Sequence, residues 1–352
     1  MGVSKQQVSD VPSSKRAPDD IASKTRGGEK RKLQITQEGI VFLITVLMFV
    51  GFSLSLHNFL TAGNVLTLLR SVSVLGMLGL GMGLVVIGRG IDLTMVASLA
   101  VGMSWALQMT SGGLPFGLAL VAGAVFVVLS GIVIGLIVAF AEIPAVFTTL
   151  AMGGVIFGVG NAFLFTSDVH NAPKNIGWLQ YLGYGAFLGV PIVIYIFAAL
   201  ALLVYFVLRW TRFGRLVYAI GDNPLTARLS GVPVRPLIVS QYVASALIAY
   251  LSGLVIVASN SGINTRIYSS TMVYDVLLVV VIGGIGLSGG RGGVRNVLVG
   301  TLLVGTLLSG MTILNFSYSV QNLVKSLVLL AALLVDTIIT PRDEQTSQQG
   351  DI

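Results

Sequence analysis

A glycine-rich stretch from Val279 to Asn296 carries the first spacing that could do chemistry. Its sequence, VVVIGGIGLSGGRGGVRN, places Gly284, Gly286 and Gly289 in a GxGxxG pattern directly after β-branched apolar residues. That pattern is typical of the turn that holds the pyrophosphate of a dinucleotide. The dinucleotide fold also needs an acidic residue about 20 positions further on. The next carboxylate here is Asp336, so the pattern does not predict a nucleotide site.

The composition points away from soluble enzymes. The chain has 352 residues, of which 55% are hydrophobic and 10% are charged, whereas soluble domains carry about 25% charged residues. Apolar runs near the bilayer-spanning length of about 20 residues recur along the chain. We therefore expect an all-α polytopic membrane protein with about ten transmembrane helices. The apolar segments are approximately 39–56, 70–88, 92–110, 115–140, 144–165, 187–208, 237–258, 274–288, 296–313 and 321–340.

The residue inventory also limits the chemistry. The chain has no cysteine and two histidines, His57 and His170, so disulfides are excluded and a transition-metal site is not expected. It has no GxxxxGK[ST] motif, so any ATP that drives it must be bound by another chain. We expect no metal and no cofactor on this chain, no catalytic residues and no nucleic-acid partner.

Charge predicts how the chain is organised and oriented. Residues 1–38 are polar and basic and predict a disordered cytosolic tail, which could also contact anionic lipid. Residues 39–340 form the transmembrane domain, and residues 341–352 form a cytosolic C-terminal tail. With the N-terminus inside, 17 Lys and Arg residues fall on the inner side and four on the outer side. By the positive-inside rule, both termini are cytosolic.

Glycine is unusually frequent, with 43 residues. The pairs Gly79–Gly83, Gly131–Gly135 and Gly154–Gly158 have the small-xxx-small spacing that lets helices approach closely, and we expect them to pack within one subunit rather than form a dimer seam. Irregular backbone at membrane depth must be buried or face a cavity. The cluster at Gly283, Gly284, Gly289, Gly290 and Gly292 therefore predicts a turn between two spans at the cytosolic face.

The loop over residues 209–236 is the most basic internal connection. It contains a short predicted helix that Asp222 or Asn223 caps, with Pro224 in its first turn and Gly231 at its end. Such a helix either is grasped by another protein or lies on lipid, and the residue pattern alone leaves both open. The predicted helix comprises Asp222, Asn223, Pro224, Leu225, Thr226, Ala227, Arg228, Leu229, Ser230 and Gly231.

Arg89 and Asp92 lie three residues apart between two apolar segments. Charges in a bilayer are costly, so they pair, reach the interface or face water. One interpretation is a gate or cytosolic-face ion pair. In the alternative, which physical reasoning favours, Asp92 caps the next helix while Arg89 reaches the lipid headgroups.

Polar residues within the apolar segments could line a path for a neutral solute, although hydrogen bonding between helices is their commoner role. The acids Glu142, Asp275 and Asp336 lie near segment ends, which argues against an ion-coupled carrier. Lys325 could either line such a path or extend its amine to the membrane interface, and the second role is the more usual one for lysine. The candidate path-lining residues are Thr148, Thr149, Asn161, Gln321, Asn322 and Lys325.

Four stretches together resemble the permease subunit of bacterial ABC importers of the ribose/monosaccharide type. They are GRGIDLTMVASLAVG (88–102), TRFGRLVYAIGDNPLTARLSGVPV (211–234), VVVIGGIGLSGGRGGVRNVLVGTLLVGTLLSGM (279–311) and LVKSLVLLAALLVD (323–336). Their order and spacing agree with that family from about residue 40 to 340. The chain departs from the family at Arg89, where glycine is usual, at Thr226, where alanine is usual, and at Ile285–Gly286.

The resemblance implies a function. It implies an importer-type permease fold of two inverted halves in the bacterial inner membrane, paired with a second permease chain. Cytosolic ATPase subunits, which bind ATP and Mg, would grip the 222–231 segment as a coupling helix. A periplasmic or lipid-anchored binding protein would deliver a sugar or sugar-like solute near residues 166–186 and 260–271. The competing interpretations are an ion-coupled secondary carrier and, less favoured, an integral-membrane enzyme.

Overall fold

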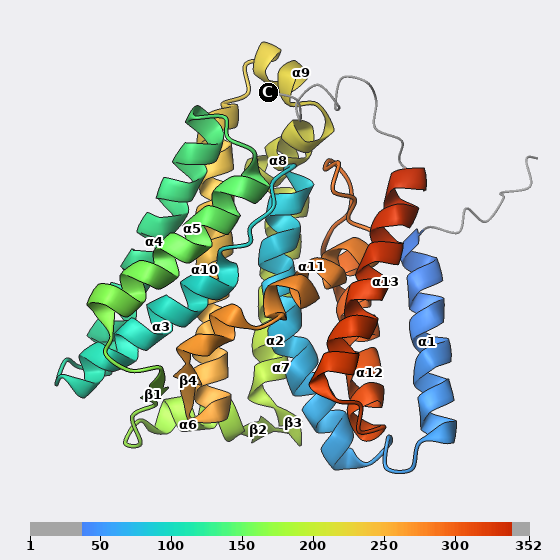
Figure 1. Cartoon of the computed structure of the whole chain (residues 1–352). Helices are drawn as coiled ribbons and strands as arrows, with labels where there is room; N and C mark the ends of the chain where they lie inside the picture. The colour runs from blue at the N-terminus through green and yellow to red at the C-terminus, as the bar shows by residue number, and fades with distance from the viewer. Residues whose placement is uncertain (1–36, 340–352) are drawn as a thin grey trace, which may run out of the picture. The chain divides into compact units, whose positions relative to one another are not determined.

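The computed structural model describes residues 37–339, which form a helical bundle (Figure 1). The predicted basic tail up to residue 36, the residues after 339 and the predicted C-terminal tail lie outside the described residues. The described helices are α1 (Gln37–Ser55), α2 (Ala62–Ile87), α3 (Met95–Ser111), α4 (Phe116–Phe140), α5 (Ala145–Val159, continued as a π-helix over Gly160–Leu164), α6 (Gly177–Tyr184), α7 (Ile192–Trp210), α8 (Arg212–Asp222), α9 (Pro224–Leu229), α10 (Val234–Asn260), α11 (Met272–Ile282), α12 (Val294–Ile313) and α13 (Tyr318–Ile339).

Each of the ten apolar segments corresponds to a helix of the described chain. Within residues 37–339, eight helices have the length and hydropathy to cross a membrane, while α3 and α11, with 17 and 11 residues, are shorter. A short helix is tolerated at membrane depth where protein rather than lipid surrounds it. Most residues of α3 and nearly all of α11 after its first turn are buried. The fold is therefore that of an all-α polytopic membrane protein.

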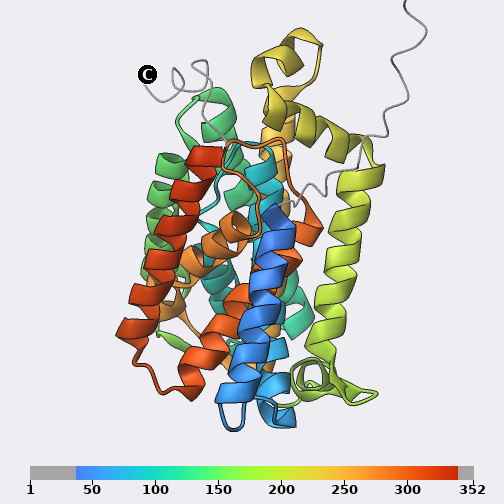
Figure 2. The same cartoon turned by 90° about the vertical axis from the view of Figure 1, so that its right-hand side faces the viewer.

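The helices differ in how far the protein covers them. Most of α2 and α10 is buried, whereas few residues of α1 and α13 are buried. In both views α2 and α10 run through the interior and α13 lies at the periphery (Figures 1 and 2). Exposed leucines along α13, including Leu323, Leu327 and Leu334, give this helix an apolar outer face.

Two of the three predicted glycine pairs pack within this chain. A Cβ atom at Gly131 would lie 2.9 Å from the Cα atom of Val243, so α4 and α10 are in backbone contact there. Gly79 and Gly83 face Val297 of α12 at similarly short range. The third pair differs, because no atom lies within 4 Å of a Cβ built at Gly158. For this pair, packing inside one subunit stays a prediction, because Gly154 has only the Tyr268 hydroxyl within 4 Å, at 3.9 Å.

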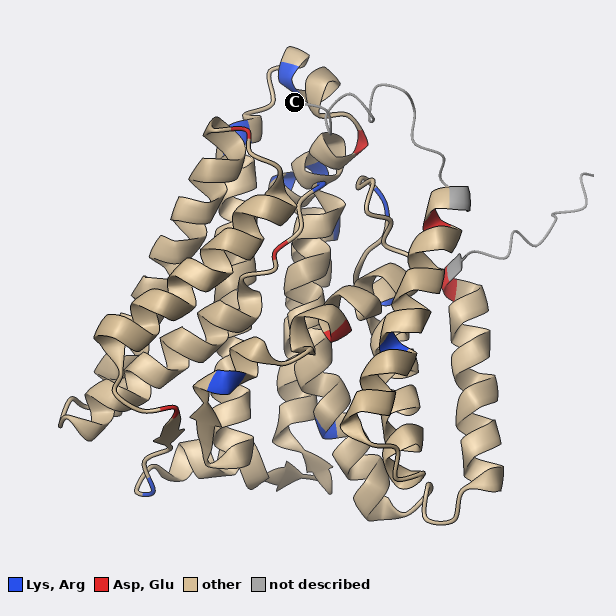
Figure 3. Cartoon of the chain, in the orientation of Figure 1, with Lys and Arg blue, Asp and Glu red and all other residues tan. Residues whose placement is uncertain are grey.

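Charge and chain direction distinguish the two ends of the bundle. The helix α1 begins, and α13 ends, at the end that carries α8 and α9 (Figure 1). Lys and Arg gather at that end (Figure 3). At the opposite end, strand β1 (Val169–Asn171) pairs antiparallel with β4 (Gly262–Asn264), and β2 (Ala186–Phe187) pairs with β3 (Val190–Pro191). The β1–β4 pairing joins the two loops expected to face a binding protein.

Candidate functional site: the α8–α9 hairpin and the core beneath it

The predicted short helix exists as α9 and is preceded by a second, amphipathic helix, α8, that the sequence did not predict. Asn223 is the N-cap of α9, because the side-chain oxygen of Asn223 accepts a hydrogen bond from the Thr226 N–H at 2.9 Å. Asp222 is instead the last residue of α8. Pro224 occupies the first turn, and Gly231 takes a φ of 79° after the helix ends. Both positions match the local chemistry of helix starts and stops.

The two faces of α9 are different. Ala227 is buried and packs with Ile220 and Leu237 in a small cluster of its own. Leu225 and Leu229 point away from the protein, with 65% and 81% of their surface exposed. A six-residue helix is too short to be stable alone, so its packing on α8 and α10 must hold it in place. The result is a projection at the end of the bundle where Lys and Arg gather (Figures 1 and 3), with two exposed leucines on its outer side.

Glu142 connects α9 to the turn between α4 and α5. Its carboxylate lies 3.7 Å from Nη1 of Arg228 and 3.4 Å from Nη2 of Arg235. All three side chains are about half exposed, and exposed ion pairs contribute about 0–1 kcal/mol each. These contacts orient the hairpin weakly, and its main attachment lies elsewhere.

Arg89 is the main attachment of the α8–α9 hairpin to the rest of the protein. The helix α2 ends in a Schellman motif, with Gly90 N–H bonded to the Val85 carbonyl at 2.9 Å and Arg89 N–H bonded to the Val86 carbonyl at 2.9 Å. Arg89 therefore takes a φ of 67°, a conformation that favours glycine. Its Nε atom donates to the carbonyl oxygens of Gly221, at 2.8 Å, and Ser288, at 2.7 Å.

A third bond joins Nη2 of Arg89 to the carbonyl oxygen of Asp222 at 3.1 Å. Gly221 and Asp222 are the last residues of α8, where carbonyl groups lack helical partners and carry partial negative charge. One guanidinium thus joins the end of α2 to the end of α8 and to the glycine-rich turn. The expectation that Arg89 reaches lipid headgroups is wrong, because its guanidinium binds these backbone carbonyls instead.

Asp92 has separate partners. It is buried and accepts hydrogen bonds from the Thr94 N–H at 2.9 Å, from the Thr94 hydroxyl, and from the Ser245 hydroxyl at 2.7 Å. Within the described residues it forms no ion pair with Arg89, so the predicted pair is wrong. The cap of α3 is Thr94 rather than Asp92. Asp92 instead fastens the α2–α3 connection to α10.

The glycine-rich segment turns the chain between α11 and α12, as the sequence predicts. Gly284, Gly289, Gly290 and Gly292 have φ values from 72° to 97°, which side chains with a Cβ rarely adopt. Gly283 has an ordinary φ of −58°, but a Cβ there would overlap the Asn296 backbone. Gly290 donates its N–H to the Ile87 carbonyl at 2.8 Å.

The same turn is bonded directly to α8. The Tyr218 hydroxyl donates to the Gly292 carbonyl at 2.8 Å. A Cβ at Gly221 would overlap both Ile87 and the Gly290 backbone. Close backbone packing therefore brings α2, α8 and the glycine-rich turn together under the α8–α9 hairpin.

The candidate path-lining residues do not form one cluster. Thr149 bonds the Ala145 carbonyl at 2.8 Å, and Thr148 is 3.4 Å from the Ile143 carbonyl. Asn161 is exposed in the π-helix, and Gln321 bonds the Phe316 carbonyl at 3.0 Å. Asn322 and Lys325 behave differently, because they line one cavity with Thr271 and Asp275.

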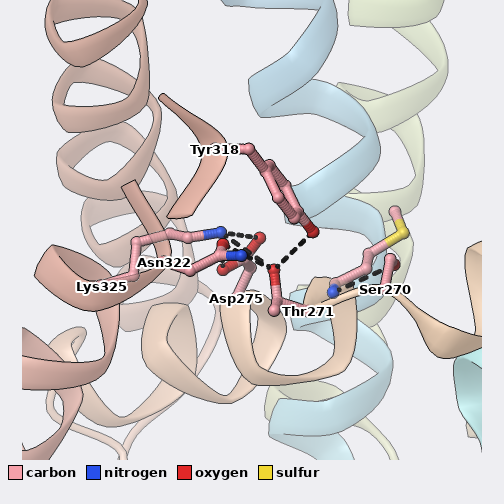
Figure 4. A network of polar contacts seen from close by, with 7 residues as sticks. Ser270, Thr271, Asp275, Tyr318, Asn322 and Lys325 are labelled. Carbon is pink, nitrogen blue, oxygen red and sulfur yellow. Dashed lines mark hydrogen bonds and ion pairs between the residues drawn. The ribbon is translucent and has the colours of Figure 1, made fainter. Parts of the chain in front are cut away.

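The contacts in that cavity identify Thr271 as a residue that sequence reasoning missed, and they show that Asp275 pairs with Lys325. Lys325 Nζ lies 2.7 Å from Oδ1 of Asp275 and 3.2 Å from the Thr271 hydroxyl (Figure 4). The sequence left two roles open for Lys325, snorkelling and lining the path, and it placed Asp275 near the end of an apolar segment. The only signal for their pairing was two opposite charges within apolar segments, 50 residues apart.

Comparisons with known proteins match the chain to membrane permeases. Residues 64–333 match the model of the family described as branched-chain amino acid transport system, permease component. The chain is similar to the ribose import permease of Escherichia coli (strain K12), with 33% identity over 85% of this chain and 93% of that protein. It is 31% identical to the ribose import permease of Bacillus subtilis (strain 168), over 84% of this chain and 91% of that protein.

A fructose import permease of Rhizobium meliloti is 28% identical, over 86% of each chain. No solved structure gives a significant match. The family model covers more than half of the chain, and the E. coli relative is matched over nearly its whole length. The chain therefore belongs to the permease-component family of ABC transport systems.

Proposed function

We propose that this chain is the membrane-spanning subunit of an ATP-driven importer that carries a sugar or sugar-like solute into the cell. Three observations support the solute class: two relatives are named ribose import permeases, one is named a fructose import permease, and all match most of the chain. ATP and Mg are bound by separate ATPase chains, since this sequence has no P-loop. This chain contributes the pathway and the surface through which ATP binding moves it.

The observation that carries the proposal is the α8–α9 hairpin. Its outer leucines, Leu225 and Leu229, are exposed at the basic end of the bundle, while its inner side is bonded to the core through Arg89. A helix that transmits force needs both an exposed contact surface and a stiff connection to the moving helices. We assign residues 222–231 as the coupling helix that the ATPase grips.

The proposed orientation places α9 and both chain termini in the cytosol. Support comes from the Lys and Arg residues near α8 and α9 (Figure 3) and from the start of α1 and end of α13 at the same end (Figure 1). The β1–β4 pair then faces outward, where a periplasmic or lipid-anchored binding protein docks. A second permease chain, the same or related, completes the pathway.

The test is retention of the ATPase by a charged α9. Leu229→Glu removes the exposed apolar contact, and Leu188→Glu is the matched control, since Leu188 is 85% exposed at the opposite end in the β2–β3 turn. In mild detergent, the parent chain and Leu188→Glu co-purify with a P-loop ATPase, and Leu229→Glu loses about 90% of it. Equal retention by both variants would contradict the coupling assignment.

A further inference from the structure

A buried ion pair joins α11 to α13 beside a cavity of about 300 Å³. Lys325 and Asp275 have 7% and 15% of their side-chain surface exposed. Lys325 Nζ is 2.7 Å from Oδ1 and 2.9 Å from Oδ2 of Asp275. Figure 4 shows these side chains directed toward one another from the two helices.

Stability alone is a weak reason for such a pair. Removing two charges from water is costly, and apolar residues of similar size are often as stable or more stable in their place. Ionisable groups at membrane depth are therefore kept chiefly where they contact a solute or a pathway. Lys325 lies in the second turn of α13, within the range long and apolar enough to span.

The surroundings of the pair are rich in hydroxyl and amide groups. The Thr271 hydroxyl accepts from Lys325 at 3.2 Å and donates to Oδ1 of Asn322 at 3.1 Å. The hydroxyl oxygen of Tyr318 lies 3.3 Å from the hydroxyl oxygen of Thr271. Tyr274 and Ser326, both exposed, also line the cavity or its rim. Such groups exchange partners readily with the hydroxyls of a solute.

The rest of the lining is apolar and consists of Leu329, Leu330 and Leu333, which follow Lys325 along α13. A lining that combines polar and apolar side chains suits a sugar, which presents hydroxyl groups at its edge and C–H groups on its face. The lining contains one positive and one negative side chain, so a neutral solute leaves their charges balanced. A charged solute would leave one buried charge without compensation.

We propose that this cavity is a hydroxyl-binding subsite of the translocation path, in which Asp275 accepts hydrogen bonds from a neutral sugar and Lys325, Thr271, Asn322 and Ser326 bind its neighbouring hydroxyls. The inference rests on the proposed function, because it needs α11 and α13 to border the path. It adds the solute-contacting residues and the preference for an uncharged polyol.

The chain has no cysteine, so one introduced thiol reports on one position. Ser326→Cys places the thiol in the cavity lining, and Leu327→Cys is the matched control: both positions are exposed and adjacent, but Leu327 does not line the cavity. The reagent is a membrane-impermeant cationic methanethiosulfonate, applied to proteoliposomes containing the assembled importer. Only thiols in contact with water ionise and react fast.

We expect the Ser326→Cys thiol to react about tenfold faster than the Leu327→Cys thiol, because its position is hydrated. Its modification should lower ATP-driven uptake of radiolabelled D-ribose or D-fructose about tenfold, while modification of Leu327→Cys changes uptake by less than about twofold. Equal reaction rates, or unchanged uptake after modification at position 326, would overturn the subsite. ATP-driven uptake by the unlabelled parent chain tests the proposed function separately.

A second variant separates solute binding from helix attachment. The double substitution Asp275→Leu with Lys325→Met replaces the ion pair by apolar residues of similar size. We expect normal expression and an unchanged melting temperature in detergent, but about tenfold lower sugar uptake. Uptake within about twofold of the parent would show that the pair only joins two helices and would overturn the proposal.

Discussion

Arg89 and Gly221, 132 residues apart, are joined by a hydrogen bond of 2.8 Å from the guanidinium Nε atom to the carbonyl oxygen. The same nitrogen lies 2.7 Å from the carbonyl oxygen of Ser288. Three segments that are distant in the sequence, the end of α2, the end of α8 and the glycine-rich turn, thus meet at one side chain. A displacement of the α8–α9 hairpin must act on α2, the most buried long helix of the described bundle.

Arg89→Gly should weaken the coupling between ATP hydrolysis and transport. Glycine suits the φ of 67° at this position and relieves about 1–2 kcal/mol of backbone strain. It also removes hydrogen bonds from a charged donor, worth about 1.5–3 kcal/mol each. We expect about tenfold less sugar imported per ATP hydrolysed, measured in proteoliposomes with the partner ATPase.

Arg89→Lys is the control for charge without the planar fork of donors. Lysine keeps the positive charge at the end of α8 but presents a single nitrogen. The sugar imported per ATP hydrolysed by Arg89→Lys should therefore lie between the values for the parent and for Arg89→Gly. If Arg89→Gly transported as much sugar per ATP as the parent, Arg89 would have no part in transmission.

Gly221→Ala should destabilise the fold. The added Cβ would overlap the Ile87 carbonyl and the Gly290 N–H, and overpacking of this kind costs about 1–3 kcal/mol. The matched control is Gly51→Ala in α1, where no atom lies within 4 Å of an added Cβ. We expect a lower melting temperature in detergent for Gly221→Ala and an equal or higher one for Gly51→Ala. Equal melting temperatures would contradict the close backbone packing.

Glu142→Gln should have little effect. It removes the carboxylate that lies near Arg228 and Arg235, but all three side chains are about half exposed. Such surface pairs contribute about 0–1 kcal/mol each. Uptake and ATPase retention should stay within about twofold of the parent at physiological salt. A severe loss would mean that Glu142 itself contacts the ATPase.

The β1–β4 pair should loosen at low pH. His170 in β1 is buried, and its Nε2 atom has no hydrogen-bond partner in the described part of the chain. Burial lowers the pKa of His170, and a backbone contact with Ser167 offsets this only in part. The unfolded segment binds a proton near its ordinary pKa of about 6.5. The stability of the folded pair is therefore complete above about pH 6.5 and falls as the pH drops below that value.

Hydrogen exchange of residues 166–172 provides the measurement. Exchange of these amides, corrected for the intrinsic effect of pH, should be faster at pH 5.5 than at pH 7.5. His170→Phe removes the titrating group and keeps a ring against Phe165, whose centroid lies 5.5 Å from that of His170. A pH response that persists in this variant would rule out His170 as its source.

The sequence predicts the helical architecture well because hydropathy reports lipid and protein burial directly. All ten apolar segments became helices of the described chain, and Asn223, Pro224 and Gly231 mark the ends of α9 as local chemistry requires. The helix α8 was missed because it has only 11 residues and carries Arg212, Arg215 and Asp222 among its apolar residues, so no long apolar run marks it. The predicted segment at 274–288 ends early, since the glycine turn begins at Gly283.

Contacts between segments that are distant in the chain could not be predicted from the sequence. Arg89 and Asp92, three residues apart, suggested a pair, yet Arg89 binds carbonyls of residues 221, 222 and 288 and Asp92 binds Ser245. Backbone carbonyls carry no sequence signal, so spacing alone could not identify these partners. The Asp275–Lys325 pair was hidden for the same reason, because it forms only when α11 packs against α13.

The most direct test of the central claim is the energy source of uptake. The chain, its co-purifying ATPase and its binding protein would be reconstituted in proteoliposomes, and uptake of radiolabelled D-ribose or D-fructose would be measured. The account predicts uptake that requires ATP on the α9 side, persists when ionophores remove all ion gradients, and is lost when Leu229→Glu replaces the parent chain. Uptake by this chain alone, driven by an ion gradient without ATP, would contradict it.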